Sequence, residues 1–340
     1  MSAEPPGPNP ATEWRGRRCL VTGATGFIGR CLVDRLRAEG AFVRGIARAH
    51  ATSAADELVL ADLAELPPGS ALLQGIDVVF HLAAKTHDMA EAEGAAAEYQ
   101  RVNVQGTARV LEVAAAAGCR RIVFVSSVKA VDEGNERAAV EEDTPHPTTA
   151  YGRSKLQAER LMFDAAAHAG FDAVCLRFPL VYGPDQRGNL QRMIEAIDRG
   201  RFPPPPPTAN RRSMLHVLNA VDALMRAGQH PAAAGRVFFV ADATPYSTRE
   251  IYDAVRAALG RPPVRWSVPD WAFRALAAGG DVARRITGRR IGFDSSAYQK
   301  LLGSASYRTD RIERELGFRP SYDLITSLAA MIARHRKAAQ

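Results

Sequence analysis

The chain has 340 residues, of which 46% are hydrophobic and 24% charged, a composition typical of a globular protein with one or two domains. No apolar run approaches the roughly 18–20 residues of a membrane-spanning helix, and the N-terminal stretch lacks the apolar segment of a signal peptide. The net charge of +7 comes from arginines dispersed among acidic residues, which argues against nucleic-acid binding and favours an anionic small molecule as the partner.

The four cysteines and the first residues of the chain indicate the environment of the protein. The cysteine spacing fits neither a C-x-x-C motif nor a metal site, and three of the four fall in or beside apolar runs. We expect buried, reduced thiols in a cytoplasmic protein that is not inserted in a membrane and holds no metal. Residues 1–14, rich in proline and small polar residues, are expected to form a disordered arm.

From residue 15 onward, apolar β-type segments alternate with helical segments rich in Ala, Leu and Glu. Near-continuous hydrophobic strands separated by helices are typical of a parallel sheet covered on both faces, and right-handed crossovers then give a doubly wound α/β fold. The expected strands are 18–23, 42–48, 58–63, 77–84, 121–127, 173–183 and 236–242, and the expected helices include 26–39, 97–117 and one that carries Tyr151.

The regular alternation ends after Gly183. The segment "RFPPPPPTANRRS" cannot be helical because each proline removes an amide donor and fixes its own backbone. We therefore predict a Rossmann dinucleotide-binding domain built from 15–182 and 214–241. A smaller, mostly helical lobe from 183–213 and 242–340 is expected to bind the substrate.

A glycine-rich loop follows the first predicted strand. The stretch "LVTGATGFIG" contains Gly23, Gly26 and Gly29, and glycines there permit a tight turn that brings backbone amides close to a pyrophosphate at the N-terminus of the next helix. The spacing is G-x-x-G-x-x-G rather than the commoner G-x-G-x-x-G. At the first strand–helix junction of a parallel sheet, this loop predicts a dinucleotide site.

Five motifs in order and register carry a family resemblance: "TGATGFIG", "HLAA", "VNVQGT", "FVSS" and "YGRSK". From about residue 17 to 330 the chain resembles the extended short-chain dehydrogenase/reductase family, of the NAD-dependent epimerase/dehydratase type. The resemblance implies a nicotinamide dinucleotide cofactor and a homodimer formed through the long helix and the Tyr-bearing helix. The cofactor contacts that it implies are Gly23, Thr25, Gly26, Phe27, Ile28, Gly29, Arg48, Asp62, Leu63, Leu82, Ala83, Ala84, Tyr151, Lys155, Pro179 and Val181.

The end of the second predicted strand indicates which dinucleotide is bound. An Asp or Glu there accepts the ribose 2′-hydroxyl of NAD, whereas an Arg suits the 2′-phosphate of NADP. The chain has Arg48 and no acid at this point, so we predict a preference for NADP(H), with NAD(H) as the alternative. Asp62 resembles the family's adenine-contacting aspartate, and its other interpretation is a helix N-cap.

Tyr151 and Lys155 lie one helical turn apart in "YGRSK", so both side chains project from one face of the helix. A free phenol has a pKa of about 10, and a neighbouring ammonium lowers it toward the range useful for proton transfer. The resemblance implies that Tyr151 is the general acid/base and that Lys155 also binds the nicotinamide ribose. A serine at the end of the fifth strand would steady charge on the substrate oxygen; Ser127 is favoured and Ser126 stays a candidate.

Several segments resemble sugar-nucleotide enzymes. "SSVKAV" and "HLAAKTHDM" are most similar to enzymes that act at C4 of UDP-linked sugars in bacterial surface-polysaccharide pathways, which implies sugar contacts at Thr86, His87 and Lys129. The resemblance also implies diphosphate contacts at Asn189 and Arg212, and a guanidinium fork suits paired phosphate oxygens. The predicted activity is oxidation or reduction at C4 of a nucleotide-linked sugar, preferably as a 4-keto sugar reductase using NADPH and otherwise as a 4-epimerase.

Two departures from the sugar-nucleotide pattern keep other functions open. Asn219 stands where those relatives usually carry an aspartate, and residues 265–293 resemble the apolar C-terminal region of 3β-hydroxysteroid-type members. The second hypothesis is therefore a sterol-type or other apolar alcohol dehydrogenase. A third is a non-catalytic NADP-sensing regulator on the same fold, against which the intact Ser/Tyr/Lys set argues.

Overall fold

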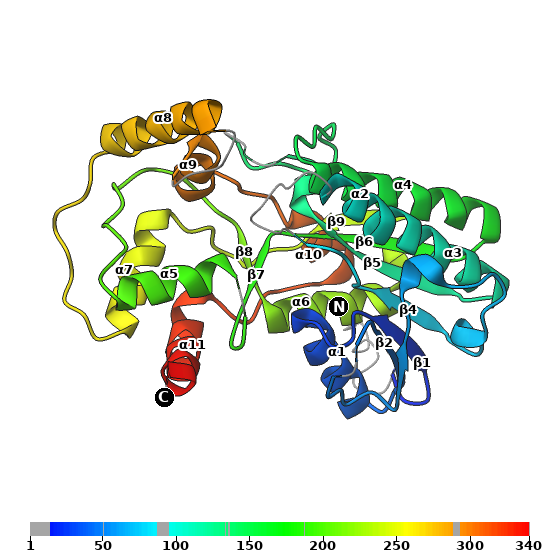
Figure 1. Ribbon diagram of the computed structural model, residues 1–340. Helices are drawn as coiled ribbons and strands as arrows, with labels where there is room; N and C mark the ends of the chain where they lie inside the picture. Colours follow the sequence, from blue (N-terminus) through cyan, green and yellow to red (C-terminus); the bar gives the residue numbers. More distant parts are fainter. Residues whose placement is uncertain are drawn as a thin grey trace, which may run out of the picture.

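Seven strands form one parallel sheet at the centre of the molecule, in the order β3-β2-β1-β4-β5-β6-β9 (Figure 1). The structure is a computed structural model that describes residues 14–49, 51–86, 95–132, 134, 137–186, 188–287 and 293–339. The strands of the sheet are β1 (Arg18–Thr22), β2 (Phe42–Ala47), β3 (Glu57–Leu60), β4 (Val78–His81), β5 (Arg121–Ser127), β6 (Asp172–Phe178) and β9 (Arg236–Phe239). The predicted doubly wound α/β fold is confirmed.

Helices cover both faces of the sheet and enclose two apolar cores. On one face, α1 (Phe27–Ala38) and α6 (Val217–Gln229) pack over residues such as Val21 and Phe80. On the other face, α3 (Gly106–Ala116) and α4 (Ala150–Ala169) lie side by side over residues such as Leu20 and Phe124 (Figure 1). Successive strand residues therefore point into different cores, which is why these strands are apolar throughout.

The helix predicted at 97–117 is continuous but not uniform. It consists of α2 (Ala95–Tyr99), a π-helical turn at Gln100–Gln105, and α3. The Thr107 hydroxyl donates to the Asn103 carbonyl oxygen at 2.6 Å inside this turn. A π-helical turn inside a helix is frequent at functional sites, and this one carries Asn103.

The single strand predicted at 173–183 is wrong: the chain divides into β6 and β7 (Leu180–Tyr182) at Pro179. Proline lacks the N–H that a central strand donates to its neighbour. β7 leaves the main sheet and pairs in parallel with β8 (Met214–His216). The predicted strand 58–63 likewise ends early, at Leu60, because Asp62 caps a short 3-10 turn at Leu63–Glu65.

The C-terminal part of the chain is mostly helical and has a core of its own. Tyr182, Leu190, Ile251 and Leu328 are among the buried residues of this core. Its helices are α5 (Asn189–Asp198), α7 (Thr248–Ala258), α8 (Asp270–Thr287), α9 (Ser295–Leu302) and α11 (Leu324–Ala339). α10 (Asp310–Leu316) falls in the predicted substrate lobe, but its apolar side chains pack into the core beneath α1 and α6.

The predicted arm ends before Trp14. Residues 1–13 lie outside the described part of the chain, but Trp14 is 1% exposed and its ring lies 5.8 Å from that of Phe80. Its assignment to the arm is therefore wrong, because a large apolar side chain here fills the first core. Cys19, Cys119 and Cys175 are buried, Cys31 is half-buried, and all four thiols are free. Among the described residues, no helix has the length and apolar character to cross a membrane.

Candidate active site

The glycine loop forms a tight turn between β1 and α1. Gly23 has a φ of +69°, and a Cβ at Gly29 would lie 2.1 Å from the Gly23 carbonyl oxygen, so neither position accommodates a side chain. Helix α1 begins at an N-cap glycine, Gly26, with no side-chain cap and no acidic residue in its first turn. The first N–H groups of a helix lack intrahelical acceptors, so the amides around Thr25, Phe27 and Ile28 suit a diphosphate.

Buried polar contacts fix the loop after β4 beside the glycine turn. The Thr22 hydroxyl oxygen accepts hydrogen bonds from the Leu82 and Ala83 amides at 3.1 and 3.0 Å. It also bonds His81 Nδ1 at 2.7 Å, and His81 Nε2 bonds the Thr107 hydroxyl at 3.0 Å. Burial, with Lys155 second, lowers the pKa of His81 to about 3, so the ring is neutral. Sequence reasoning missed this histidine, although a His within an apolar strand signals a buried polar contact.

The residues predicted to select the cofactor lie at the edge of the same region. Arg48 is exposed and has no hydrogen bond or ion pair with any described residue. Asp62 Oδ1 caps the 3-10 turn by accepting from the Ala64 amide, and Oδ2 pairs with Arg101 at 2.8 Å. The hydrogen bond from Arg101 lowers the pKa of the Asp62 carboxyl. The N-cap interpretation of Asp62 is confirmed, and an adenine contact stays a prediction, as does one at buried Leu63.

The segment that follows β6 comes close to the start of α1. Pro179 and Val181 are half-buried between β6 and the end of β7. A Cβ at Gly183, just beyond β7, would lie 3.4 Å from the ring of Phe27, the first residue of α1. The predicted cofactor residues after β1, β4 and β6 are therefore gathered at the carboxyl end of the sheet, where doubly wound folds bind ligands.

Helix α4, which carries Tyr151, begins against the turn that follows β5. Its N-cap Thr149 accepts from the Gly152 amide at 3.1 Å. A Cβ at Gly152 would lie 2.2 Å from the Lys129 carbonyl oxygen, so only glycine allows the helix to lie this close to the turn after β5. Tyr151 is 8% exposed, and its ring meets that of Tyr99 edge-on at 5.8 Å.

Lys155 is buried beneath the tyrosine and points into the sheet. Its Nζ donates to the Val125 carbonyl oxygen at 2.7 Å and lies 4.1 Å from the centroid of the Phe124 ring. Burial lowers the pKa of the Lys155 ammonium to about 8. The side chain is thus held in the interior one helical turn from Tyr151, and its role beside a phenolate stays a prediction.

We expect the stability of a Lys155→Met variant, relative to the native protein, to depend on pH. The folded protein releases the Lys155 proton near pH 8, whereas the unfolded chain holds it up to the ordinary pKa of 10.5. Between these values the unfolded state binds more protons, so native stability rises with pH. The unfolding free energy of the variant minus that of the native protein is therefore greatest below pH 8. This difference falls by a few kcal/mol toward pH 10.5, at about 1.4 kcal/mol per pKa unit. Urea melts across this range measure it, and a constant difference would contradict the account.

The two candidate serines project to different sides of β5. The Ser126 hydroxyl donates to Glu159 Oε1 at 2.5 Å, and Glu159 forms a buried ion pair with Arg177 at 2.7 Å. The Ser127 hydroxyl caps the turn at Val128–Ala130 by accepting from the Lys129 amide at 3.3 Å. The Ser126 hydroxyl therefore binds the buried Glu159–Arg177 ion pair. This favours Ser127 as the hydroxyl that faces the substrate.

Asn103 joins three of the segments that build the site. Its Oδ1 accepts from the Lys85 amide at 2.7 Å, and its Nδ2 donates to the Lys85 carbonyl oxygen at 3.1 Å. The same Nδ2 donates to the Ser154 hydroxyl at 3.0 Å, and Ser154 in turn donates to the Tyr151 carbonyl oxygen. The side chain thus fixes the loop after β4 relative to the Tyr-bearing helix.

The predicted substrate residues differ in their surroundings. Thr86 and Asn189 are exposed, Lys129 is half-buried, and His87 lies outside the described residues. Arg212 is half-buried: its backbone pairs with Tyr246, and its Nη1 donates to the Gly303 carbonyl oxygen at 2.8 Å. No carboxylate of the described residues pairs with this guanidinium, and burial lowers its pKa.

Asn219 is a structural residue at the start of α6. Its Nδ2 donates to Asp242 Oδ1 at 2.7 Å and to the Tyr322 carbonyl oxygen at 2.8 Å, and its Oδ1 accepts from the Ser321 amide at 3.0 Å. An aspartate could not donate to Asp242, and would place a second carboxylate beside it. The departure noted at this position therefore follows from its neighbour Asp242 and carries no information about the substrate.

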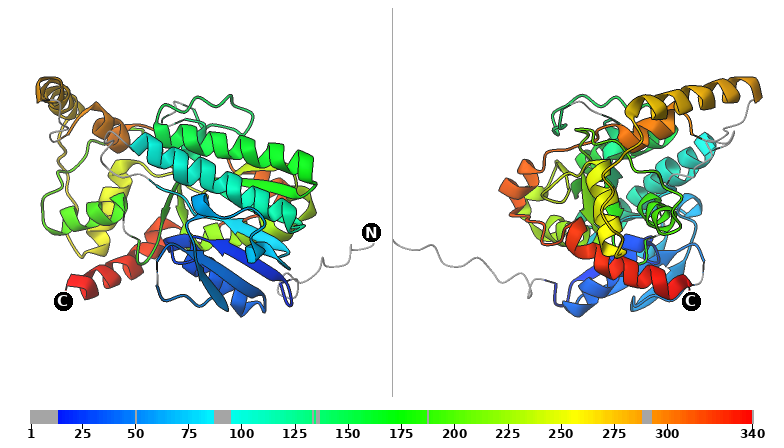
Figure 2. Two further views of the ribbon diagram at one scale, coloured as in Figure 1. Left: turned by 45° about the vertical axis from the view of Figure 1, so that its right-hand side comes forward. Right: turned by 90° about the vertical axis from the view of Figure 1, so that its left-hand side faces the viewer.

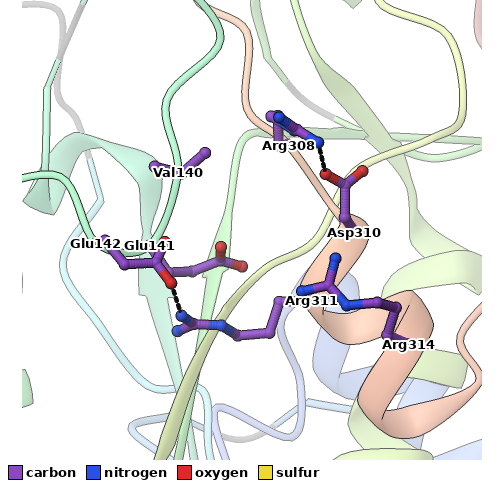
Figure 3. Close-up of a pocket in the computed structure, with 7 residues that line it drawn as sticks. All are labelled: Val140, Glu141, Glu142, Arg308, Asp310, Arg311 and Arg314. Carbon is purple, nitrogen blue, oxygen red and sulfur yellow. Dashed lines mark hydrogen bonds and ion pairs between the residues drawn. The ribbon is translucent and has the colours of Figure 1, made fainter.

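Figure 3 shows a cavity of about 200 Å³ at another place, between the segment 140–142 and the start of α10. Four of its six charged residues form two ion pairs, Arg311 with Glu142 and Arg308 with Asp310. None of the predicted site residues lines it. This cavity lies between the loop after β5 and α10, and it is not part of the candidate active site. Within the described part of the chain, no cluster of His, Cys, Asp and Glu could hold a metal ion.

Comparison with known proteins agrees with this geometry. Residues 19–241 match the model of the NAD dependent epimerase/dehydratase family. A UDP-glucose 4-epimerase of Vibrio cholerae is 31% identical, over 84% of this chain and 89% of its own. A 4-hydroxy-2-methyl-3-oxo-4-farnesyl-3,4-dihydroquinoline-1-oxide ketoreductase of Stigmatella aurantiaca is 30% identical, over 88% of this chain and 91% of its own.

A solved structure extends the likeness to three dimensions. The structure of MoeE5 in complex with UDP-glucuronic acid and NAD superposes with a TM-score of 0.75 at 30% identity, covering 94% of this chain and 99% of that one. The fold and the site thus define a dinucleotide-dependent α/β enzyme of the short-chain dehydrogenase/reductase type. The chain belongs to the NAD dependent epimerase/dehydratase family.

Proposed function

We propose that this protein is an NAD(P)-dependent oxidoreductase that acts at C4 of a UDP-linked sugar, and that it works as a 4-epimerase. Membership of the family, the 31% identity to a UDP-glucose 4-epimerase and the likeness to a protein crystallised with a UDP-sugar and NAD support this proposal. The sequence alone favoured a 4-keto sugar reductase; the named activity of the relative favours the epimerase.

The observation that carries the choice of substrate is the half-buried guanidinium of Arg212. A charge that is partly removed from water is costly without a partner, and no carboxylate of the described residues compensates this one. A diphosphate would supply the missing negative charge and accept from the planar fork of donors. An apolar alcohol or sterol would leave the guanidinium uncompensated, which disfavours the second hypothesis.

The residues at the carboxyl end of the sheet have distinct roles in this proposal. A nicotinamide dinucleotide bound at the carboxyl end of the sheet would supply the hydride acceptor and donor for C4. The glycine turn at Gly23–Gly29 holds the diphosphate at the start of α1. It keeps this shape because Gly29 has no side chain to clash with the Gly23 carbonyl oxygen. Tyr151 exchanges the proton of the C4 hydroxyl, Lys155 stabilises the phenolate, and Ser127 donates a hydrogen bond to the C4 oxygen.

We predict that Arg212→Met raises the KM for a UDP-sugar by roughly 10–100-fold, the value of losing charge-assisted hydrogen bonds worth about 1.5–3 kcal/mol. The kcat and the affinity for the dinucleotide should change little, because Arg212 does not contact the reacting atoms. Arg211→Met is the matched control, since the exposed Arg211 pairs with Glu250 at 3.2 Å. Steady-state kinetics of both variants measure KM and kcat. An unchanged KM in Arg212→Met, with an unchanged melting temperature, would exclude the contact between Arg212 and the diphosphate.

The predicted preference for NADP(H) rests on Arg48, which is exposed and free of ion pairs with the described residues. If its guanidinium binds the 2′-phosphate, Arg48→Ala should weaken NADPH binding by about 10-fold or more and leave NADH binding unchanged. Fluorescence titration with both dinucleotides measures this. Equal affinities in the native protein and the variant would reject the preference and leave NAD, which the NAD-bound relative favours.

A 4-keto sugar reductase that exchanges its cofactor is the second candidate, favoured by the absence of an acid after β2 and by the free Arg48. It would use the same tyrosine as a proton donor.

We also propose a homodimer formed through α3 and α4, which lie side by side on one face of the sheet. Light scattering tests the dimer, and a monomer at working concentration would reject it.

A further inference from the structure

Helix α8 presents an apolar face outward. Trp271 is 71% exposed, Val282 53% and Ile286 78%. Together with the exposed residues Ala275 and Ala278 they follow one another at intervals of three or four, so they form a single stripe along the helix. Trp266, just before the helix, is 63% exposed and extends this surface. We call these six residues the α8 outer face.

The two carboxylates of α8 face the protein instead of the solvent. Asp270 accepts a hydrogen bond from the Tyr298 hydroxyl at 2.7 Å, and Asp281 accepts one from Ser295, both on α9. Phe273 is buried on this inner side. α8 is thus fixed on α9 with its apolar stripe turned away. Both views of Figure 2 place α8 at the outer edge of the molecule.

Two arginines without ion pairs border the outer face. Arg265 directly precedes Trp266, and Arg285 lies one turn after Val282, at the edge of the stripe. Both are exposed and form no ion pair with any described residue. The two acids of α8 already have partners: Arg274 pairs with Asp270 at 2.6 Å, and the Ser295 hydroxyl holds Asp281. The surface is therefore apolar at its centre and positive at its margins, with two exposed tryptophans.

We propose that the α8 outer face docks on the surface of an anionic lipid bilayer. Apolar side chains that include Trp enter the boundary between headgroups and acyl chains, while arginines meet anionic headgroups. Two copies of this chain cannot pair well through the same face, because a two-fold axis would bring the unpaired arginines together with no free carboxylate on α8 to meet them. The docking is peripheral, and it does not depend on which substrate the enzyme uses.

The test uses the full-length protein and two kinds of vesicle, phosphatidylcholine alone and equal parts of phosphatidylcholine and phosphatidylglycerol. The chain has three tryptophans, and Trp14 is already buried, so a blue shift of emission reports Trp266 and Trp271. We expect a blue shift and co-sedimentation with the anionic vesicles, weakened by about 10-fold or more in Arg265→Glu/Arg285→Glu and by added salt. Binding to both kinds of vesicle alike would overturn the anionic part of the proposal.

Val282→Asp and Ile325→Asp form a matched pair. Each places a carboxylate at an apolar site that is 53% exposed, but only Val282 lies on the α8 outer face. Vesicle binding should be lost in Val282→Asp and kept in Ile325→Asp, with catalytic activity in solution unchanged in both. The proposal would be overturned if both variants lost vesicle binding equally, or if the native protein did not bind vesicles. It would also be overturned if the protein formed a dimer that Val282→Asp dissociates while vesicles have no effect.

Discussion

Replacing Tyr151 by phenylalanine should lower kcat by roughly 10²–10⁴-fold, the usual contribution of a positioned general acid/base. The variant removes only the hydroxyl and keeps the ring that packs edge-on against Tyr99 at 5.8 Å. The fold and the affinity for the dinucleotide should therefore be unaffected. Turnover of a UDP-sugar, a melting curve and a dinucleotide titration measure the three quantities.

Tyr99→Phe is the control for this variant, because it removes a second phenol from the same neighbourhood. We expect its kcat to stay within a few-fold of the native value, since Tyr99 has no counterpart of the ammonium one turn away. If both variants lose activity alike, loss of the phenol at position 151 acts through packing, and the acid/base role of Tyr151 is wrong.

Breaking the ion pair beneath the catalytic helix should cause the largest loss of stability. The side chains of Glu159 and Arg177 are 4% and 6% exposed, and the carboxylate also accepts from Ser126. Arg177→Met leaves the carboxylate buried without its cation, a change that costs roughly 3–5 kcal/mol of unfolding free energy. Urea denaturation at neutral pH measures the loss.

The double variant Arg177→Met/Glu159→Leu tests the physical cause. Replacing both charges by apolar side chains removes the uncompensated carboxylate, and such exchanges are often neutral or stabilising. We expect the double variant to recover most of the stability lost in Arg177→Met. A loss equal to the sum of two single variants, Arg177→Met and Glu159→Leu, would show that packing rather than charge determines the effect.

The sequence predicts the sheet well because its strands are buried on both faces and therefore read as apolar runs separated by helices. It predicts strand ends less well, since those depend on local geometry. Pro179 ends β6 and turns β7 into a separate pair with β8, and the pairing partner lies more than thirty residues away. Trp14 was assigned to an arm by its neighbours in sequence, whereas its burial depends on Phe80.

In the candidate active site, too, local features follow from the sequence and long-range contacts do not. Tyr151, Lys155 and the glycine loop follow from short-range motifs, and the structure brings them to one end of the sheet. The choice between Ser126 and Ser127 depends on Glu159 and Arg177, which come from two other elements. The sequence signal that was available is Arg177 itself, because an arginine within an apolar strand requires a buried partner.

Asn219 shows how a departure from a family pattern can mislead. From the sequence it questioned the sugar substrate, but its side chain donates to Asp242 and accepts from the backbone at Ser321. The exposed face of α8 is the converse case: residues 265–293 suggested an apolar substrate, whereas the structure exposes Trp266, Trp271, Val282 and Ile286 on the outside.

The central claim is reversible oxidation at C4 of a UDP-linked sugar. The most direct measurement is to purify the protein, identify any nicotinamide dinucleotide released on denaturation, and then incubate the native protein with UDP-glucose and with UDP-N-acetylglucosamine while following the sugar by NMR. We predict a retained nicotinamide dinucleotide and formation of the C4 epimer of at least one sugar, abolished in Tyr151→Phe. Protein without dinucleotide that leaves both sugars unchanged, but reduces a 4-keto sugar with NADPH, would contradict the epimerase; oxidation of an apolar alcohol alone would contradict the sugar substrate.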